Sequence, residues 1–167
     1  MKFLRSLFAP RTNPAGPLYE RLVAEARSKN WYLAGGIPDT IDGRFAVLAT
    51  LVARTIVRLE EDGEDGIHDS AALTERFVTD MDAQIRQAGF DTTLSKKVRK
   101  LVSAMGARSE AWREADRDNG DAVAAVAASA LCVDGEPPSE AAIELLRLAD
   151  SQIGNASRAH LMTGDWS

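Results

Sequence analysis

The strongest constraint on the fold is the helical spacing of apolar residues in the segment that follows Thr40. Apolar side chains recur there at intervals of three and four residues, which places them on one side of an α-helix. The positions are Ile41, Phe45, Leu48, Ala49, Val52, Ile56 and Leu59. Arg54 and Arg58 fall on the opposite side. The pattern predicts an amphipathic helix that reaches about Glu61 and is capped at its start by Asp39 or Thr40.

The same period recurs along the chain, and no segment shows the alternation of a strand. Further helices are predicted over 17–29, from 69 or 70 to 89, over 93–117, over 121–133, and onward from 139. Predicted loops are 30–38, which Trp31 and Tyr32 pin to the core, and the acidic turn 62–66. After Gly154 the pattern weakens, and the tail either docks or frays.

The predicted fold is all-α, an irregular single-domain bundle of five to seven helices. Aromatic residues make up only 6% of the chain and alanine is abundant, which favours closely packed helices over a β-sandwich. Residues 1–16 are predicted to be a flexible or amphipathic N-terminal segment, and residues 17–167 the helical domain.

Charge is distributed in blocks that the net value of −5 conceals. Residues 60–91 carry ten acidic and two basic groups, whereas residues 92–113 carry six basic groups and one acidic group. An acidic chain is a poor general nucleic-acid ligand, so no specific DNA binding is expected. The basic block still leaves room for an anionic partner.

Motifs for catalysis or cofactor binding are missing from the sequence. His68 and His160 lie far apart, with no ligand at metal-binding spacing. Cys132 is the only cysteine, which fits a reducing compartment, and it is interpreted as a small buried apolar residue rather than a nucleophile. Residues 34–37 lack the Lys-Ser/Thr of a phosphate-binding loop. We therefore expect a protein that is not an enzyme and holds no cofactor or metal.

Two clusters remain as candidate binding sites, and the first surrounds Gly43-Arg44. Asp39, Thr40 and Asp42 are explained by capping and by the helix dipole. A glycine within the first turns costs about 1 kcal/mol relative to alanine, so Gly43 indicates close approach of another backbone or of a partner. Arg44 then reaches an acidic group either in the fold or on that partner. Both structural packing and a partner surface stay open here.

The second cluster pairs Asp80 with the basic run Lys96, Lys97, Arg99 and Lys100. These cations lie opposite the apolar stripe of their helix, so they form either a solvated face or a docking strip for an anionic surface. Ribosomal RNA, anionic lipid headgroups and the acidic segment 60–82 of this chain are the candidate surfaces.

The first ten residues alternate apolar and basic side chains. Phe3, Leu4, Leu7 and Phe8 recur at helical spacing, with Lys2 before them and Arg5 between them. This run is too short for a signal peptide or a membrane span, but it suits shallow insertion at the headgroup level. The alternatives are a disordered start or an end that packs on the body.

The residues of these clusters resemble the ubiquinol–cytochrome c chaperone family of alphaproteobacteria and mitochondria. The matching residues are Leu18-Tyr19, Pro38-Asp39-Thr40-Ile41-Asp42-Gly43-Arg44-Phe45, Asp80-Met81-Asp82 and Lys96-Lys97-Val98-Arg99-Lys100. The resemblance covers roughly residues 1–113, and the C-terminal third matches little. Ala46 stands where relatives often have an acidic residue, and Met105 to Arg108 follows the usual pattern only loosely.

The resemblance implies an all-helical chaperone for assembly of the cytochrome bc complex, respiratory complex III. Its implied partners are newly made cytochrome b, the ribosome and the anionic inner-membrane surface, and its implied location is cytoplasmic or peripheral at the cytoplasmic face of that membrane. Asp39, Asp42, Arg44, Phe45, Asp80 and the basic run are then the partner-binding residues. A general helical adaptor without a folding client is the alternative, and a small helical enzyme is a third hypothesis.

Overall fold

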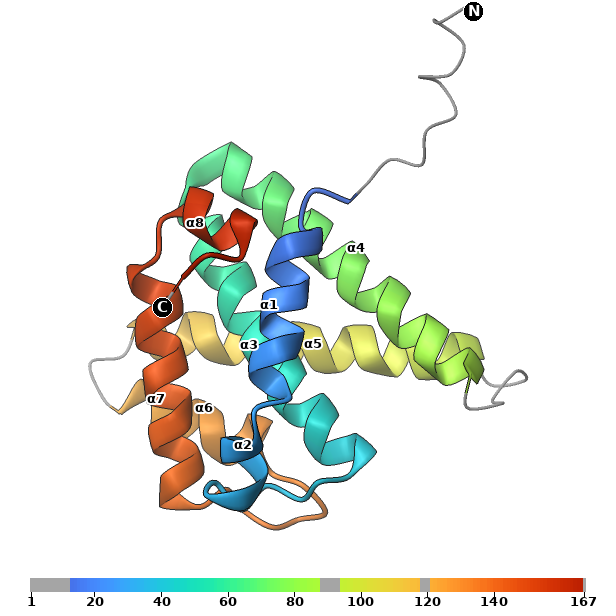
Figure 1. Ribbon diagram of the computed structural model, residues 1–167, viewed down its shortest axis with the longest axis vertical. Coiled ribbons are helices and arrows are strands. Elements are labelled where there is room, and N and C mark those ends of the chain that lie inside the picture. Colours follow the sequence, from blue (N-terminus) through green and yellow to red (C-terminus); the bar gives the residue numbers. More distant parts are fainter. Residues whose placement is uncertain (1–12, 88–93, 118–120, 167) are drawn as a thin grey trace, which may run out of the picture.

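The computed structural model describes residues 13–87, 94–117 and 121–166, and in these ranges it is all-helical apart from an isolated antiparallel bridge between Val133 and Glu136. The eight helices are α1 (Gly16–Ala26), α2 (Lys29–Leu33), α3 (Ile41–Glu60), α4 (Gly63–Gln87), α5 (Leu94–Arg117), α6 (Ala122–Ala130), α7 (Glu140–Asn155) and α8 (Arg158–Thr163) (Figure 1). The predicted all-α single-domain bundle is confirmed. The two helices that are additional to the six ranges predicted from the sequence are the short α2 and α8.

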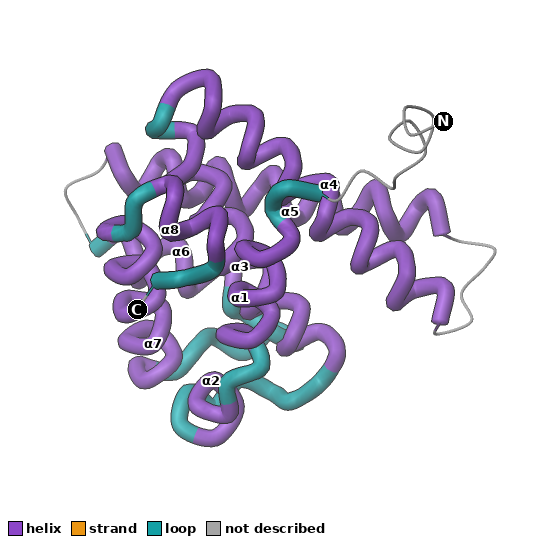
Figure 2. Tube along the Cα trace, turned by 45° about the horizontal axis from the view of Figure 1, so that its top comes forward, coloured by secondary structure: helices purple, strands orange, loops and turns teal. Residues whose placement is uncertain are grey.

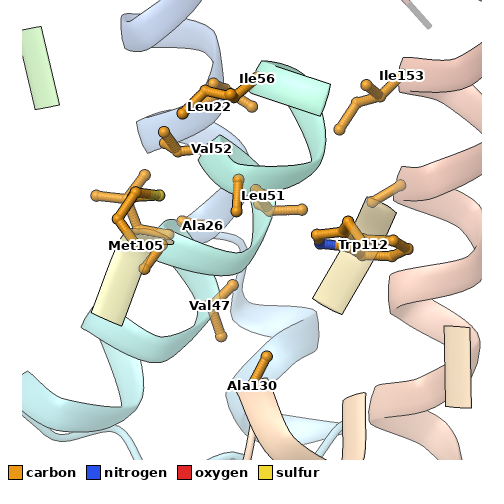
Figure 3. Packing of buried hydrophobic residues seen from close by; sticks show 14 of the residues in the cluster. Leu22, Ala26, Val47, Leu51, Val52, Ile56, Met105, Trp112, Ala130 and Ile153 are labelled. Atoms are coloured by element: carbon orange, nitrogen blue, oxygen red, sulfur yellow. The ribbon is translucent and has the colours of Figure 1, made fainter. Parts of the chain in front are cut away.

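Helix α3 is the centre of the bundle. It packs against α1, α4, α5, α6 and α7, and every residue from Ala46 to Val57 is buried. Figure 3 shows Val47, Leu51 and Val52 of α3 surrounded by side chains from neighbouring helices. The indole N–H of Trp112 on α5 donates to the Thr50 carbonyl oxygen at 3.3 Å, so a polar contact also ties α5 to this helix.

The side of α3 opposite its apolar stripe is covered rather than solvated. Arg54 is only 7% exposed and forms an ion pair with Asp150 of α7, while its guanidinium lies 5.6 Å from the Trp112 ring centroid. Thr50 and Thr55 are fully buried and donate to the carbonyl oxygens one turn earlier, at 2.7 and 2.9 Å. Buried polar groups need such partners, and the helix itself and α7 supply them.

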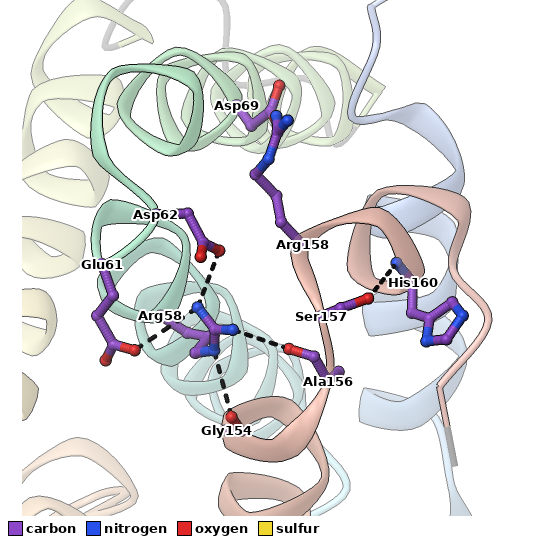
Figure 4. A network of polar contacts seen from close by, with 9 residues as sticks. All are labelled: Arg58, Glu61, Asp62, Asp69, Gly154, Ala156, Ser157, Arg158 and His160. Carbon is purple, nitrogen blue, oxygen red and sulfur yellow. Dashed lines mark hydrogen bonds and ion pairs between the residues drawn. The ribbon is translucent and has the colours of Figure 1, made fainter.

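Arg58 joins the end of α3 to the end of α7 (Figure 4). Its guanidinium donates to the carbonyl oxygens of Gly154 at 3.2 Å and of Ala156 at 3.0 Å, and pairs with Asp62 at 2.9 Å. Carbonyl groups at a helix C-terminus lack helical partners, and a cation satisfies them well. The arginines on this side of α3 therefore hold α7 in place.

The start of α3 follows the capping prediction. The Thr40 hydroxyl accepts from the Gly43 N–H at 3.1 Å, which confirms Thr40 as the N-cap. A Cβ atom on Gly43 would lie 1.9 Å from the carbonyl oxygen of Pro38. The close approach that Gly43 indicated is therefore made by the chain's own backbone.

The turn between α3 and α4 is tighter than predicted. The prediction of an acidic loop over 62–66 was wrong, because α4 begins at Gly63. Asp69 and Ser70, where the start of this helix was predicted, are buried within it. A Cβ on Gly66 would lie 1.8 Å from the Leu59 carbonyl oxygen. The glycines that suggested a loop instead allow the two helices to approach closely at a short turn.

Three smaller differences concern segment ends. The loop over 30–38 contains α2, whose Trp31 is 1% exposed and pins the segment as predicted. Helix α6 ends at Ala130, earlier than predicted, so the helical period stops there and Cys132 is exposed, not buried. The tail docks through α8, whose Leu161 is fully buried.

Replacing Gly43 by alanine tests the backbone contact at the start of α3. Helix propensity alone would stabilise the variant by about 1 kcal/mol, but the added Cβ must displace the Pro38 carbonyl, which costs about 1–3 kcal/mol. We expect Gly43→Ala to lower the free energy of unfolding in urea titrations. Gly106→Ala is the matched control, because nothing lies within 4 Å of a Cβ there. A Gly43→Ala variant as stable as Gly106→Ala would contradict the contact.

Removing Asp150 tests the buried ion pair. Asp150→Ala leaves the guanidinium of Arg54 buried without this carboxylate, and we expect a loss of about 3 kcal/mol in the free energy of unfolding. The control on the same helix is Glu144→Ala, which removes an exposed pairing with Arg147 and should cost less than about 1 kcal/mol. Equal losses in chemical denaturation would show that burial of the Arg54 pair is energetically irrelevant.

Candidate partner-binding surface

An open groove of about 590 Å³ lies between α1 and α4 on the described surface. Helix α1 buries Leu18, Tyr19, Leu22 and Ala26 on the body, which leaves its other side available to line the groove. The lining residues are Tyr19, Glu20, Val23, Ala24 and Arg27 from α1 and Arg76, Asp80, Ala83, Gln84 and Gln87 from α4. The α1 wall therefore combines apolar and polar side chains, and the α4 wall is polar except for Ala83.

A polar cluster joins the two walls of the groove. The Tyr19 hydroxyl donates to Oδ2 of Asp80 at 2.7 Å, and the Gln84 amide donates to the same oxygen at 2.8 Å. The guanidinium of Arg76 lies 4.9 Å from the Tyr19 ring centroid and 4.0 Å from Oδ1 of Asp80. Burial, reinforced by the bond to Asp80, raises the pKa of Tyr19 well above its usual value, so this phenol stays a hydrogen-bond donor.

This cluster connects two of the motifs that the sequence showed separately. Tyr19 belongs to the Leu18-Tyr19 pair and Asp80 to the Asp-Met-Asp run, and the structure brings them into direct contact. Sequence reasoning named Asp80 but missed Tyr19 as its partner. The available signal was the spacing of Arg76, Asp80 and Gln84, which are four residues apart and therefore share one side of α4.

The cluster around Arg44 is held within its own chain. Arg44 Nε donates to Oδ1 of Asp39 at 2.6 Å, and the guanidinium lies 5.9 Å from the ring centroid of Tyr32. The bond from Arg44 holds the pKa of Asp39 below its usual range. Both side chains of this pair are more than half exposed, and Asp42 is exposed in the first turn of α3.

Phe45 lies on the inner side of this cluster. Its ring centroid is 6.1 Å from that of Phe77 on α4, and the guanidinium of Arg108 on α5 lies 5.6 Å from it. Arg108 also donates to the carbonyl oxygen of Ala130 at the end of α6, at 3.0 Å, and burial lowers its pKa. Phe45 and Arg108 therefore connect α3, α4, α5 and α6, and sequence reasoning had not assigned Arg108 a role.

The basic run occupies the first turns of α5. Figures 1 and 2 both show the C-terminal part of α4 and the N-terminal part of α5 extending together away from the body. Lys100 is exposed, and Lys96, Lys97 and Arg99 lie on the helical backbone, with side chains outside the described set. In both views this helical pair lies away from α2 and the start of α3, so the Arg44 cluster and the basic run are separate regions.

Other candidate positions contribute no described site. Phe3, Leu4, Leu7 and Phe8 lie outside the described residues. Within residues 13–87, 94–117 and 121–166, no group of three or more His, Cys, Asp or Glu side chains is placed to hold a metal ion. In the same ranges no helix is both long enough and apolar enough to span a bilayer.

The fold has a counterpart among solved structures. It is similar to the crystal structure of the Cbp3 homolog from Brucella abortus, with a TM-score of 0.69, 24% sequence identity, and an alignment that covers 99% of this chain and 93% of that chain. No curated protein matches the chain in sequence.

A family model describes most of the chain. The model for the ubiquinol–cytochrome C chaperone matches residues 33–167. The match includes the Arg44 cluster, Asp80 and the basic run, and it continues through the C-terminal third, where the sequence had suggested little similarity. The chain therefore belongs to the ubiquinol–cytochrome c chaperone family, the assembly chaperones of respiratory complex III.

Proposed function

We propose that this chaperone binds newly made cytochrome b during assembly of complex III, and that the α1–α4 groove receives an apolar segment of that client. The groove carries the proposal because it is open, elongated between two helices, and lined by both apolar and hydrogen-bonding groups. Val23, Ala24 and Ala83 offer apolar contact, and the two alanines leave space for another backbone to approach.

The polar cluster gives the groove a fixed floor. Tyr19 and Asp80 are bonded to each other, so neither needs a client to satisfy it, and their hydrogen bond keeps the two walls in register. The rim residues Arg27, Gln84 and Gln87 supply hydrogen-bonding groups for the polar backbone or ends of a client segment. The chain then acts by holding a macromolecule and catalyses no reaction.

The site of action in this proposal is the ribosome or the cytoplasmic face of the inner membrane. Lys96, Lys97, Arg99 and Lys100 supply attraction to an anionic surface, and the apolar residues among 3–8 add shallow insertion at a membrane. The basic run lies on the part of α5 that extends from the body beside the C-terminal part of α4 (Figure 2), and α4 supplies one wall of the groove. Asp39, Asp42, Arg44 and Phe45 form a second contact region in the proposal, next to the start of α3.

Filling the groove tests the client site. Ala83 is exposed in the groove, so Ala83→Trp should fold normally and occupy the space that the client needs. We expect the recovery of nascent cytochrome b in pull-downs from growing cells to fall by about tenfold, which corresponds to a loss of ~1.4 kcal/mol in binding free energy.

The control for this experiment is Ala71→Trp, an exposed alanine of the same helix that does not line the groove. It should recover as much cytochrome b as the unmodified chain. If Ala83→Trp retains full capture while both variants are folded by circular dichroism, the client binds elsewhere.

Charge reversal tests the basic run. The triple variant Lys96→Glu, Lys97→Glu, Lys100→Glu should lose salt-sensitive co-sedimentation with ribosomes or with anionic vesicles, because attraction becomes repulsion. The charge-preserving variant Lys96→Arg, Lys97→Arg, Lys100→Arg should sediment like the original chain. Sedimentation that is unchanged by charge reversal in a folded protein would exclude the run as an anchoring surface.

A further inference from the structure

We infer that residues 3–8 of this chain bind in its own α1–α4 groove, where they compete with the client. The competition rests on the function proposed above, whereas the docking itself does not. The N-terminal segment is then an internal occupant of the groove that must leave before a client segment enters.

The place where the described chain begins favours this occupant. Asn13 is fixed to α4, because its side-chain amide donates to the Ala72 carbonyl oxygen at 2.9 Å, and Ala15 beside it is fully buried. Ala72 lies one helical turn before Arg76, the first residue of α4 that lines the groove. The N-terminal segment therefore starts at one end of the groove.

The segment is also long enough. From Ala72 to Gln87 the helix axis of α4 advances about 22 Å, and from Ala72 to Ala83 it advances about 16 Å, at ~1.5 Å per residue. The twelve residues before Asn13 reach up to about 40 Å when extended. Leu7 lies six residues before Asn13 and reaches up to about 20 Å, so residues 3–8 can reach the groove wall as far as Ala83 when the connecting residues are extended.

The lining of the groove offers the segment both carboxylates and apolar side chains. Residues 1–12 carry three basic groups and no acidic group. The groove is lined by the carboxylates of Glu20 and Asp80 as well as by Arg27 and Arg76, so its own charges balance and apolar contact carries the docking. Phe3, Leu4, Leu7 and Phe8 provide apolar side chains for the surface formed by Val23, Ala24 and Ala83.

Covalent attachment favours this segment over a separate peptide that carries the same side chains. A short tether gives the N-terminal segment an effective concentration on the order of millimolar at the groove. A free segment of equal intrinsic affinity must reach that concentration to displace it.

Cysteine cross-linking in the full chain tests the docking. In a Cys132→Ser background, which removes the exposed native thiol, Leu7→Cys is combined with Ala83→Cys in the groove or with Ala71→Cys outside it. If the segment is only loosely tethered, the disulfide with position 71 forms faster, because this position is next to the anchoring residue Ala72. If the segment is docked, the disulfide with position 83 forms faster, and we expect its rate in dilute protein to be about tenfold higher than that of the pair with position 71. A faster reaction at Ala71, or equal rates, overturns the docking.

A second measurement separates the competition from the client proposal. Leu4→Ser with Leu7→Ser in the full chain should weaken the docked segment and raise capture of nascent cytochrome b several-fold. If the original chain captures cytochrome b and the double variant captures the same amount, the competition is overturned. If the Ala83 cross-link forms but neither chain captures cytochrome b, the client proposal fails and the docking in cis stands.

Discussion

Burial of α3 on all sides is the constraint on which the rest of this structure depends. A helix at the centre of a bundle must satisfy its polar side chains without water, because an unpaired buried charge costs several kcal/mol. Thr50 and Thr55 bond to their own helix, but Arg54 needs an anion from outside, and Asp150 of α7 supplies it. The position of α7 thus follows from the charge on α3 as well as from apolar contact.

The groove forms because α1 and α4 both pack on α3 and leave an open surface between them. Helix α1 directs its buried side at the bundle and contacts α3, α4 and α8, while α4 extends beyond the body alongside α5. The walls are held at one end by the Tyr19–Asp80 bond and by α8, where Arg158 pairs with the buried Asp69 of α4 at 2.7 Å. A fixed floor with open walls suits the temporary holding of an extended or helical segment better than the enclosure of a small molecule.

Local sequence patterns were sufficient to predict most of the helices, but not which residues of other helices contact them. The period of apolar residues identified α3, and Thr40 is the cap among the two candidates. The helices predicted to start at 121 and 139 begin at the capping side chains of Asp121 and Ser139, because such starts depend on neighbours within a few residues. The burial of Arg54 was not predictable, since Asp150 is ninety-six residues away. The α3–α4 turn failed for a related reason: glycine marks close packing as often as a loop, and only the fold shows that Gly66 faces the Leu59 carbonyl.

The same distinction applies to the candidate site. Sequence motifs included Tyr19 and Asp80, but gave no sign that the two are in contact. They also predicted that Arg44 reaches an acidic group. The structure shows that Arg44 has that partner in Asp39, so its exposed pair is already satisfied, whereas Tyr19 and Asp80 define the floor of an open groove. An internally paired charge contributes little binding energy to a partner until that pairing is exchanged, but the apolar side chains Val23, Ala24 and Ala83 of the groove contribute as soon as water leaves them. Within the proposed function, the groove is therefore the stronger basis for client binding, and the proposed role of the charged regions is attraction to an anionic surface.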